Sequence, residues 1–360
     1  MKLPEKVIVA MSGGVDSSVA AWLYREKGAE VIGVTLRLRP QNIAGQDGCL
    51  SREDEEQAAA VARQLGIPHE ILDYSEDFVR EVLQPSWEEF ARGRTPNPCT
   101  LCNPRIKFGK LLAYADQIGA DRVATGHYAE IFETDGLRQI RRGLDPAKDQ
   151  SYFLFGLTQT MLQRLDFPVG ALAKPEVREL ARRAGLVTHD KKDSQDTCFL
   201  VPGESFQESL RKLFQATVPG GLIVGADGRR LGKHTGIHQY TLGQRKGLGV
   251  ALGVPAYVTK IDPASRTVTL SADEDELVSR RFSVAAVNWQ NGKTPTAPFP
   301  ALIQVRYRSR AVPGRVIPGV DGQVEIELET PIRAVTPGQA AVFYDRDILL
   351  GGGYIYTLEE

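Results

Sequence analysis

The feature that most constrains this 360-residue chain is a glycine- and serine-rich segment near its N-terminus, residues 12–18. It follows an apolar run, residues 7–10, and precedes a stretch in which apolar residues recur at helical spacing. That order predicts a buried strand, a tight loop and a helix. Glycines let a backbone approach an anion closely, and the N–H groups at a helix start attract negative charge. We therefore expect this loop to hold the phosphates of a ligand.

The side chains of the loop support the same interpretation. The hydroxyls of Ser12, Ser17 and Ser18 add hydrogen-bond donors, and Asp16 supplies a carboxylate that could hold Mg²⁺ against the phosphates. The loop is not a Walker A motif, which ends in Gly-Lys-Ser/Thr. A second candidate for that motif, around Lys233, fails because Asp227 occupies the required earlier glycine position.

Length and composition favour a globular protein of two or three domains. The chain is 42% hydrophobic and 25% charged, and no apolar run approaches the length of a membrane span. Residues 1–6 lack the apolar core of a signal peptide. We therefore expect a cytoplasmic protein that does not associate with membranes.

The charge is unevenly distributed although the net charge is only −1. Residues 228–261 and 277–320 contain no Asp or Glu but hold six and seven Lys or Arg residues. Such segments are typical of a phosphate-binding face, and equally of strands with ordinary exposed arginines. Charge alone does not decide between the two.

The four cysteines, Cys49, Cys99, Cys102 and Cys198, are too few for a disulfide scaffold. Cys99 and Cys102 form a Cys-x-x-Cys pair, a pattern that favours metal binding or redox chemistry. Cys49 has no role that the sequence assigns.

Strand-like and helix-like segments alternate through the first half of the chain. Residues 31–36 and 67–72 read as strands and residues 53–65 as a helix, which predicts an α/β fold with a doubly wound parallel sheet. Ligands of such sheets lie beyond the carboxyl ends of the strands, where the phosphate loop also falls. From residue 218 onward, short alternating runs and glycine-rich turns predict a small central domain and a C-terminal β-barrel. We place the domains at 1–202, 203–273 and 274–360.

Several motifs together resemble one family. The Ser-Gly-Gly-x-Asp-Ser loop is similar to the PP-loop of ATP pyrophosphatases, the adenine nucleotide alpha hydrolase-like group. Further segments, in order and spacing, resemble the tRNA-specific 2-thiouridylases: residues 93–103, 124–128, 148–153, 192–199, 241–249 and 336–344.

The resemblance implies 2-thiolation of the wobble uridine of tRNA. ATP, with Mg²⁺, would activate the C2 oxygen as an adenylate and release pyrophosphate, and sulfur would then displace AMP. Cys198 would carry the sulfur as a persulfide, with Cys102 as its partner nucleophile. Thiolates are the reactive forms, so nearby cations such as Arg105, Lys191 or Lys192 would assist.

The resemblance also assigns binding positions. The ATP positions would be Ala10, Met11, Ser12, Gly13, Gly14, Val15, Asp16, Ser17, Leu36 and Gly126. The target-base positions would be Asn97, Pro98 and Cys99. The tRNA positions would be His127, Lys148, Asp149, Gln150, Arg306, Tyr307 and Gln339. Ordinary structural roles are the alternatives: a buried histidine at 127, a solvated turn at 148–149 and an exposed strand residue at 306.

Position 99 departs from the family pattern, in which Asp is common, and this opens a second mechanism. Cys99, Cys102 and Cys198 could bind a [4Fe-4S] cluster with one iron open to sulfide, and zinc would require a fourth ligand such as His189 or water. We favour the persulfide, and an active, colourless, iron-free anaerobic preparation would exclude the cluster.

The implied partners are tRNA and a sulfur donor, either a cysteine desulfurase or a sulfur-relay protein, and the family implies a monomer. Two functions of other classes compete: a PP-loop ligase acting on a small molecule, and a non-catalytic tRNA- or metal-binding protein. The paired thiols and basic β-rich segments favour the thiouridylase over the ligase. Loss of thiolation with retained tRNA binding in Asp16→Ala would favour the enzyme over the binding protein.

Overall fold

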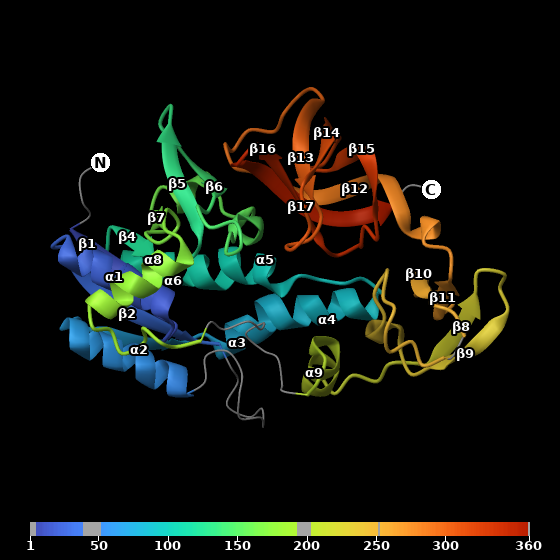
Figure 1. Ribbon diagram of the computed structural model, residues 1–360, viewed down its shortest axis with the longest axis horizontal. Coiled ribbons are helices and arrows are strands. Elements are labelled where there is room, and N and C mark those ends of the chain that lie inside the picture. Colours follow the sequence, from blue (N-terminus) through green and yellow to red (C-terminus); the bar gives the residue numbers. More distant parts are fainter. Residues whose placement is uncertain (1–4, 39–51, 193–202, 251–252, 359–360) are drawn as a thin grey trace.

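Three β-sheets, arranged along the long axis of the molecule, organise the computed structural model (Figure 1). The structure describes residues 5–38, 52–192, 203–250 and 253–358. Cys49 and Cys198 lie outside the described residues, as does most of the 192–199 motif.

The first sheet has five parallel strands in the order β3-β2-β1-β4-β7, which confirms the predicted doubly wound α/β fold. Its strands are β1 (Lys6–Ala10), β2 (Glu30–Arg37), β3 (His69–Asp73), β4 (Arg122–Ala124) and β7 (Leu165–Asp166). The order runs outward from β1 in one direction through β2 and β3, and in the other through β4. The carboxyl ends of β1 and β4 therefore form the switch point at which such sheets bind ligands.

Helices cover both faces of this sheet because successive residues of a buried strand point to opposite sides. Val7 and Val9 pack with α1 (Val15–Glu26), α2 (Arg52–Leu65) and α8 (Lys174–Arg183), whereas Ile8 packs on the other side. The helical elements contributing to that second core are α3 (Ser75–Phe78), η1 (Val79–Leu83), α4 (Gln84–Ala91), α5 (Pro98–Cys102), η2 (Asn103–Phe108), α6 (Gly109–Ile118), η3 (Ser151–Leu154) and α7 (Gln159–Leu162).

The middle part of the chain forms a separate four-stranded sheet with its own apolar core, in the order β10-β11-β8-β9. Its elements are α9 (Phe206–Leu213), β8 (Gly221–Gly225), β9 (Arg230–His234), η4 (Ile237–Gln239), β10 (Tyr257–Asp262) and β11 (Thr267–Ser271). In Figure 1 this sheet lies at the end of the molecule opposite the first sheet.

The C-terminal part is an antiparallel β-barrel, as predicted. Strands follow the order β12-β15-β14-β13-β16-β17, and pairing of β12 with β17 closes the barrel. The elements are η5 (Asp275–Leu277), β12 (Val278–Trp289), β13 (Phe299–Gln304), β14 (Val312–Pro318), β15 (Val324–Arg333), β16 (Ala340–Asp345) and β17 (Ile348–Leu358). Between β14 and β15, Asp321 and Gly322 both have positive φ, the backbone of a tight hairpin turn.

A hairpin from the first domain extends the barrel sheet, a feature that the sequence analysis missed. Strands β5 (Ala129–Thr134) and β6 (Leu137–Arg142) pair with each other, and Arg141 of β6 pairs with Ile348 of β17. The first domain and the barrel are thus joined by backbone pairing as well as by side chains.

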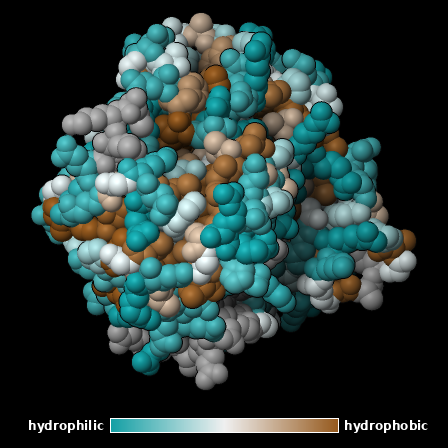
Figure 2. All heavy atoms as spheres, turned by 60° about the vertical axis from the view of Figure 1, so that its left-hand side comes forward, coloured by the Kyte–Doolittle hydropathy of each residue, from teal (hydrophilic) through white to brown (hydrophobic). Residues whose placement is uncertain are grey.

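The face of the molecule that carries the first sheet is mainly hydrophilic, interrupted by hydrophobic patches (Figure 2). Large exposed apolar side chains are dispersed over different elements, as Ile71, Leu144 and Val187 illustrate. Within the described ranges, no helix combines the length and apolar character that crossing a bilayer requires.

Candidate active site

The glycine-serine loop follows β1 and opens α1, as the sequence predicts. Gly13 has φ +70°, and a side chain there would overlap the carbonyl oxygen of Asp54 on α2. Gly14 caps α1, and its carbonyl accepts hydrogen bonds from the hydroxyls of Ser17 (3.0 Å) and Ser18 (2.8 Å). The first N–H groups of α1 have no carbonyl within the helix to donate to, so they can face an anion.

A cavity of about 210 Å³ lies beside this loop, at the carboxyl ends of β1 and β4. Gly126 follows β4 and lies against α1, because an added Cβ would stand 2.7 Å from the backbone N of Ser17. The predicted ATP positions that line the cavity are Ala10, Met11, Ser12, Asp16, Ser17, Leu36 and Gly126. Gly13, Gly14 and Val15 belong to the same turn without lining the cavity, and Val15 is buried in the core under α1.

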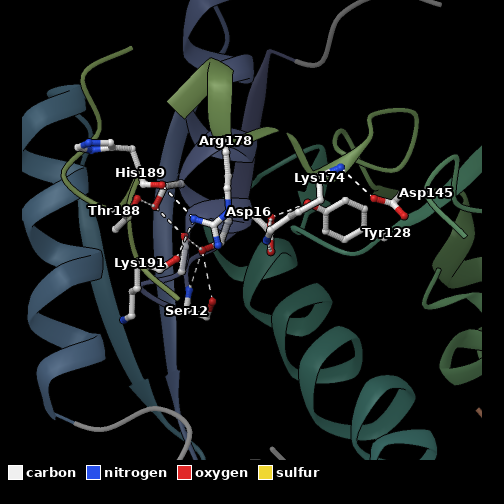
Figure 3. Close-up of polar contacts among 12 residues, drawn as sticks. Ser12, Asp16, Tyr128, Asp145, Lys174, Arg178, Thr188, His189 and Lys191 are labelled. Carbon is white, nitrogen blue, oxygen red and sulfur yellow. Dashed lines mark hydrogen bonds and ion pairs between the residues drawn. The ribbon is translucent and has the colours of Figure 1, made fainter. Parts of the chain in front are cut away.

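Cationic side chains from distant parts of the chain converge on the loop (Figure 3). Lys174, the first residue of α8, pairs with Asp16, to which the Tyr128 hydroxyl also donates. Lys191 donates to the carbonyl of Gly13 (3.1 Å) and pairs with Asp54 (2.5 Å), and Arg178 holds the carbonyl of Lys191 (3.0 Å). The sequence analysis gave Lys174 and Arg178 no role because no local motif marks them, and it gave Tyr128 no role although Tyr128 ends the 124–128 motif.

Two predicted tRNA positions, His127 and Gln150, line the same cavity as the ATP positions. The ring of His127 is buried between Phe108 and Phe167, with Nδ1 2.7 Å from the Thr125 hydroxyl. Burial holds the pKa of His127 well below its usual range, with a smaller contribution from Lys107, so the ring is neutral at pH 7. The side-chain oxygen of Gln150 accepts from the backbone N–H of Tyr128 (3.0 Å).

The predicted target-base segment starts a long helical run that carries Cys102. Asn97 caps α5 by accepting from the backbone N–H of Cys99 (3.2 Å), and α5 continues through η2 into α6. Pro104 cannot donate a backbone hydrogen bond, and the run widens there into a π-helical turn, a feature often found at functional sites. Cys102 is buried and Cys99 is partly exposed.

The π-helical turn also delivers Lys107 to the cavity. Lys107 lies five positions after Cys102 on the same helical run and is the cationic side chain in the cavity lining. One continuous helical run therefore links the Cys-x-x-Cys segment to the cavity beside the glycine-serine loop. The sequence analysis missed Lys107, although it lies beside the Cys-x-x-Cys motif.

The segment preceding Cys102 is held by the other two domains. Gln339 donates from its side-chain amide to the carbonyls of Thr95 (2.7 Å) and Pro96 (3.2 Å). The backbone N–H of Thr95 donates to Pro337 (2.9 Å), and its hydroxyl donates to Thr241 of the central domain (3.0 Å). Gln339, predicted to bind tRNA, thus positions the target-base segment in this structure.

The remaining predicted tRNA positions also make internal contacts. The carboxylate of Asp149 is buried and accepts hydrogen bonds from Arg142, Gly143 and Ser151. Arg306 donates to the Thr336 hydroxyl (3.1 Å) and to the Ala334 carbonyl. Because its carboxylate is already engaged, Asp149 has a structural role here that the sequence did not separate from RNA binding.

Tyr307 lies on Phe153, with ring centroids 4.3 Å apart. Burial raises the pKa of its hydroxyl, and the charges of Asp149 and Cys99 contribute in the same direction. The charges of Arg308 and Lys148 act on the same pKa in the opposite direction. Phe153 belongs to η3, which packs against α5 and η2, and its carbonyl accepts from the side-chain amide of Asn103 (3.0 Å). Tyr307 of the barrel domain therefore lies near the helical run that begins at the predicted target-base segment.

Metal or cluster binding by three cysteines is not tested by the geometry, since Cys198 lies outside the described residues. Among the residues that are described, no group of three or more His, Cys, Asp or Glu side chains could hold a metal ion.

Comparison with known proteins identifies the three parts of the chain. Residues 5–202 match a family model described as the tRNA methyl transferase HUP domain. Residues 208–272 match the tRNA methyl transferase PRC-barrel domain, and residues 279–355 the aminomethyltransferase beta-barrel domain.

Curated relatives match over nearly the whole chain. A tRNA-specific 2-thiouridylase MnmA from Solibacter usitatus is 45% identical, covering 98% of this chain and 100% of the relative. The protein of the same name from Syntrophotalea carbinolica is 46% identical, covering 97% and 98%. A third, from Roseiflexus sp., is 45% identical, covering 97% and 99%.

Proposed function

Because the chain belongs to the family of tRNA-specific 2-thiouridylases, we propose that it uses ATP to replace the C2 oxygen of the wobble uridine of tRNA by sulfur. The observation that carries the proposal is the joint lining of one cavity. Three elements face this cavity: the glycine-serine loop after β1 (residues 12–18, the phosphate-type loop), Gly126 after β4, and Lys107 from the helical run of Cys102. A nucleotide bound there would lie beside the element that carries a thiol.

The residues of the cavity fit ATP. The loop offers N–H groups at a helix start, and Lys107 adds positive charge. Leu36 and Leu38 supply apolar contact from the end of β2 and the residue after it. Mg²⁺ on Asp16 does not fit, since the oxygens of that carboxylate already accept from Lys174 and Tyr128. We therefore derive no step through a metal held by Asp16.

The proposed reaction has two displacements. The C2 oxygen of uridine attacks the α-phosphorus of ATP, the bond to the β-phosphate breaks, and pyrophosphate leaves. The terminal sulfur of a persulfide on Cys198 then attacks C2, and the C2–O bond breaks to release AMP. The Cys102 thiolate attacks the remaining sulfur of Cys198, leaving 2-thiouridine and a Cys102–Cys198 disulfide. A dithiol reductant must reduce that disulfide before a sulfur donor reloads Cys198.

Buried neutral groups suit the first displacement. His127 is neutral because burial depresses its pKa, so it can accept or donate a hydrogen bond without adding charge to the cavity. Phe108 and Phe167 pack against the His127 ring and limit the access of water to it.

The central domain supports a role in binding tRNA. Its acid-free segment carries six basic residues, all exposed: Arg229, Arg230, Lys233, Arg245, Lys246 and Lys260. Exposed cations of this kind neutralise phosphates and make affinity depend on salt. Target uridine must leave the base stack to reach the cavity, and the Phe153–Tyr307 pair offers an aromatic surface beside the target-base segment.

The deciding experiment is nucleoside analysis by mass spectrometry. Unmodified tRNA is incubated anaerobically with the protein, ATP, MgCl₂, dithiothreitol, and a cysteine desulfurase with L-cysteine, which delivers sulfur at the persulfide oxidation level. Cys102→Ser is the matched control. We expect 2-thiouridine with wild-type protein and none with Cys102→Ser. A methylated uridine without 2-thiouridine would contradict the proposal and would indicate methyl transfer to tRNA instead. If thiolation requires iron, the [4Fe-4S] cluster, and not a persulfide on Cys198, would be the sulfur carrier.

A further inference from the structure

We propose that Asp16 anchors the ammonium group of Lys174 and is not a ligand of Mg²⁺, and that Lys174 is a positioning residue of the nucleotide site. The proposal concerns a residue that carries no recognisable motif. It rests on the proposed function only in that ATP binds the cavity beside the loop.

The contacts of Asp16 leave little room for a metal. Lys174 Nζ lies 2.7 Å from Oδ1 and 2.8 Å from Oδ2, and the Tyr128 hydroxyl lies 2.6 Å from Oδ1 (Figure 3). Mg²⁺ requires carboxylate oxygens at about 2.0–2.1 Å in a regular octahedron. An Mg²⁺ ion at that distance from either oxygen would share the carboxylate with the positively charged ammonium group of Lys174 and would be repelled by it.

Lys174 is held from three sides. It begins α8, where its backbone N–H donates to the carboxylate of Asp145 (3.0 Å). Its ammonium group lies 5.6 Å from the centre of the buried Tyr128 ring. Only 9% of the Lys174 side chain is exposed, so the ammonium group cannot swing into solvent without breaking these contacts.

The arrangement has an electrostatic purpose. Asp16 lines the nucleotide cavity, and an unpaired carboxylate there would repel the polyphosphate of ATP. The bidentate pair with Lys174 cancels that charge and fixes the carboxylate where it accepts from Tyr128. Removing one partner of such a largely buried pair leaves an uncompensated charge. Mg²⁺ would therefore enter the site already bound to the triphosphate of ATP and would not be coordinated by Asp16.

The test is equilibrium binding of ATP by calorimetry, in MgCl₂ and in EDTA, without tRNA. For Lys174→Met we expect at least tenfold weaker binding, equivalent to about 1.4 kcal/mol. The double variant Asp16→Asn with Lys174→Met should recover to within about threefold of wild type, since the repelling charge is gone. Asp16→Asn alone leaves the Lys174 ammonium unpaired, so its ATP affinity relative to wild type should change by the same factor in MgCl₂ and in EDTA. Arg183→Met, an exposed cation on the same helix, is the matched control.

Tyr128→Phe keeps the test usable if Lys174→Met does not fold, which melting curves reveal. It removes one donor to Asp16, and we expect a two- to threefold loss that disappears in the Asp16→Asn background. A loss in Asp16→Asn confined to MgCl₂ would overturn the proposal in favour of a metal ligand. A double variant as weak as Lys174→Met would overturn it in favour of direct phosphate contact or a purely structural role. Normal ATP binding without thiolation of tRNA would refute the proposed function and leave this inference intact.

Discussion

The two glycines of the phosphate-type loop should respond differently to the same substitution. Gly14 has φ −92°, and a Cβ added to it would meet only the Ser12 hydroxyl, at an ordinary 3.4 Å. Gly13 has φ +70°, and its Cβ would overlap the Asp54 carbonyl. The structure therefore separates a glycine that the fold requires from one whose open side is available to a ligand.

The magnitudes follow from these geometries. Alanine at the helix cap of Gly14 weakens the cap by about 0.5–1 kcal/mol, while the smaller entropy of the unfolded chain returns about 0.4–1 kcal/mol. The net change in unfolding free energy is close to zero. At Gly13 the left-handed backbone alone costs about 1–2 kcal/mol, and the overlap with Asp54 adds to it because a helix backbone must move. Gly13→Ala should therefore be clearly destabilised.

The assay combines thermal melting with equilibrium ATP binding for both variants. Gly14→Ala should melt within about one degree of wild type yet bind ATP at least tenfold more weakly, because its methyl group would stand against the Ser12 hydroxyl of the cavity lining, at the helix start where a phosphate would bind. Gly13→Ala should lose several degrees of melting temperature. Wild-type ATP affinity in a folded Gly14→Ala variant would refute the assignment of this loop to phosphate binding.

Three further predictions concern the thiols, the cavity cation and pH. Cys102→Ser should abolish thiolation while retaining ATP binding, whereas Cys99→Ser should retain measurable thiolation; loss of activity in both, together with loss of bound iron, would favour the cluster. Lys107→Met should weaken ATP binding about tenfold. Lys110→Met should not, because the ammonium group of Lys110 pairs with Asp77 at 3.1 Å. Equal ATP affinity of the wild type, Lys107→Met and Lys110→Met would show that Lys107 does not belong to the site. Burial lowers the pKa of four histidines, His69, His127, His234 and His238, so the unfolded chain takes up protons more readily than the folded one. The free energy of unfolding should therefore fall as pH drops below about 6.5. Urea unfolding midpoints at pH 7.5 and 5.5 measure the change, and a higher midpoint at pH 5.5 would contradict it.

Local sequence pattern was sufficient for the strands β1, β2 and β3 and for the phosphate-type loop, but not for the short strand β7. The apolar run before Ser12 and the glycine turn after it are neighbours in the chain, so strand, turn and helix could be predicted together. The β5–β6 hairpin was missed although Asp135 and Gly136, both at positive φ, form a typical hairpin turn. Its pairing with β17 joins residues about two hundred positions apart, which periodicity does not reveal.

The missed residues of the site share the same physical reason. Lys174 meets Asp16 across 158 residues of sequence, and its importance comes from burial beside an acid rather than from a motif. Gln339 was assigned to tRNA from resemblance alone, and its contacts with Thr95 and Pro96 became visible only once the barrel was placed. Sequence pattern identifies which segments carry chemistry, whereas the partners that set their charge and position depend on tertiary structure.

Thr95 shows why the three domains are needed together. Its backbone is held by Pro337 and Gln339 of the barrel domain, and its hydroxyl by Thr241 of the central domain. Seven residues later the same segment reaches Cys102, and five residues beyond that Lys107 lines the nucleotide cavity. One short segment therefore carries both the thiol and the cavity cation and is hydrogen-bonded to both β domains. The site is thus joined to the central and barrel domains by covalent continuity and by hydrogen bonds.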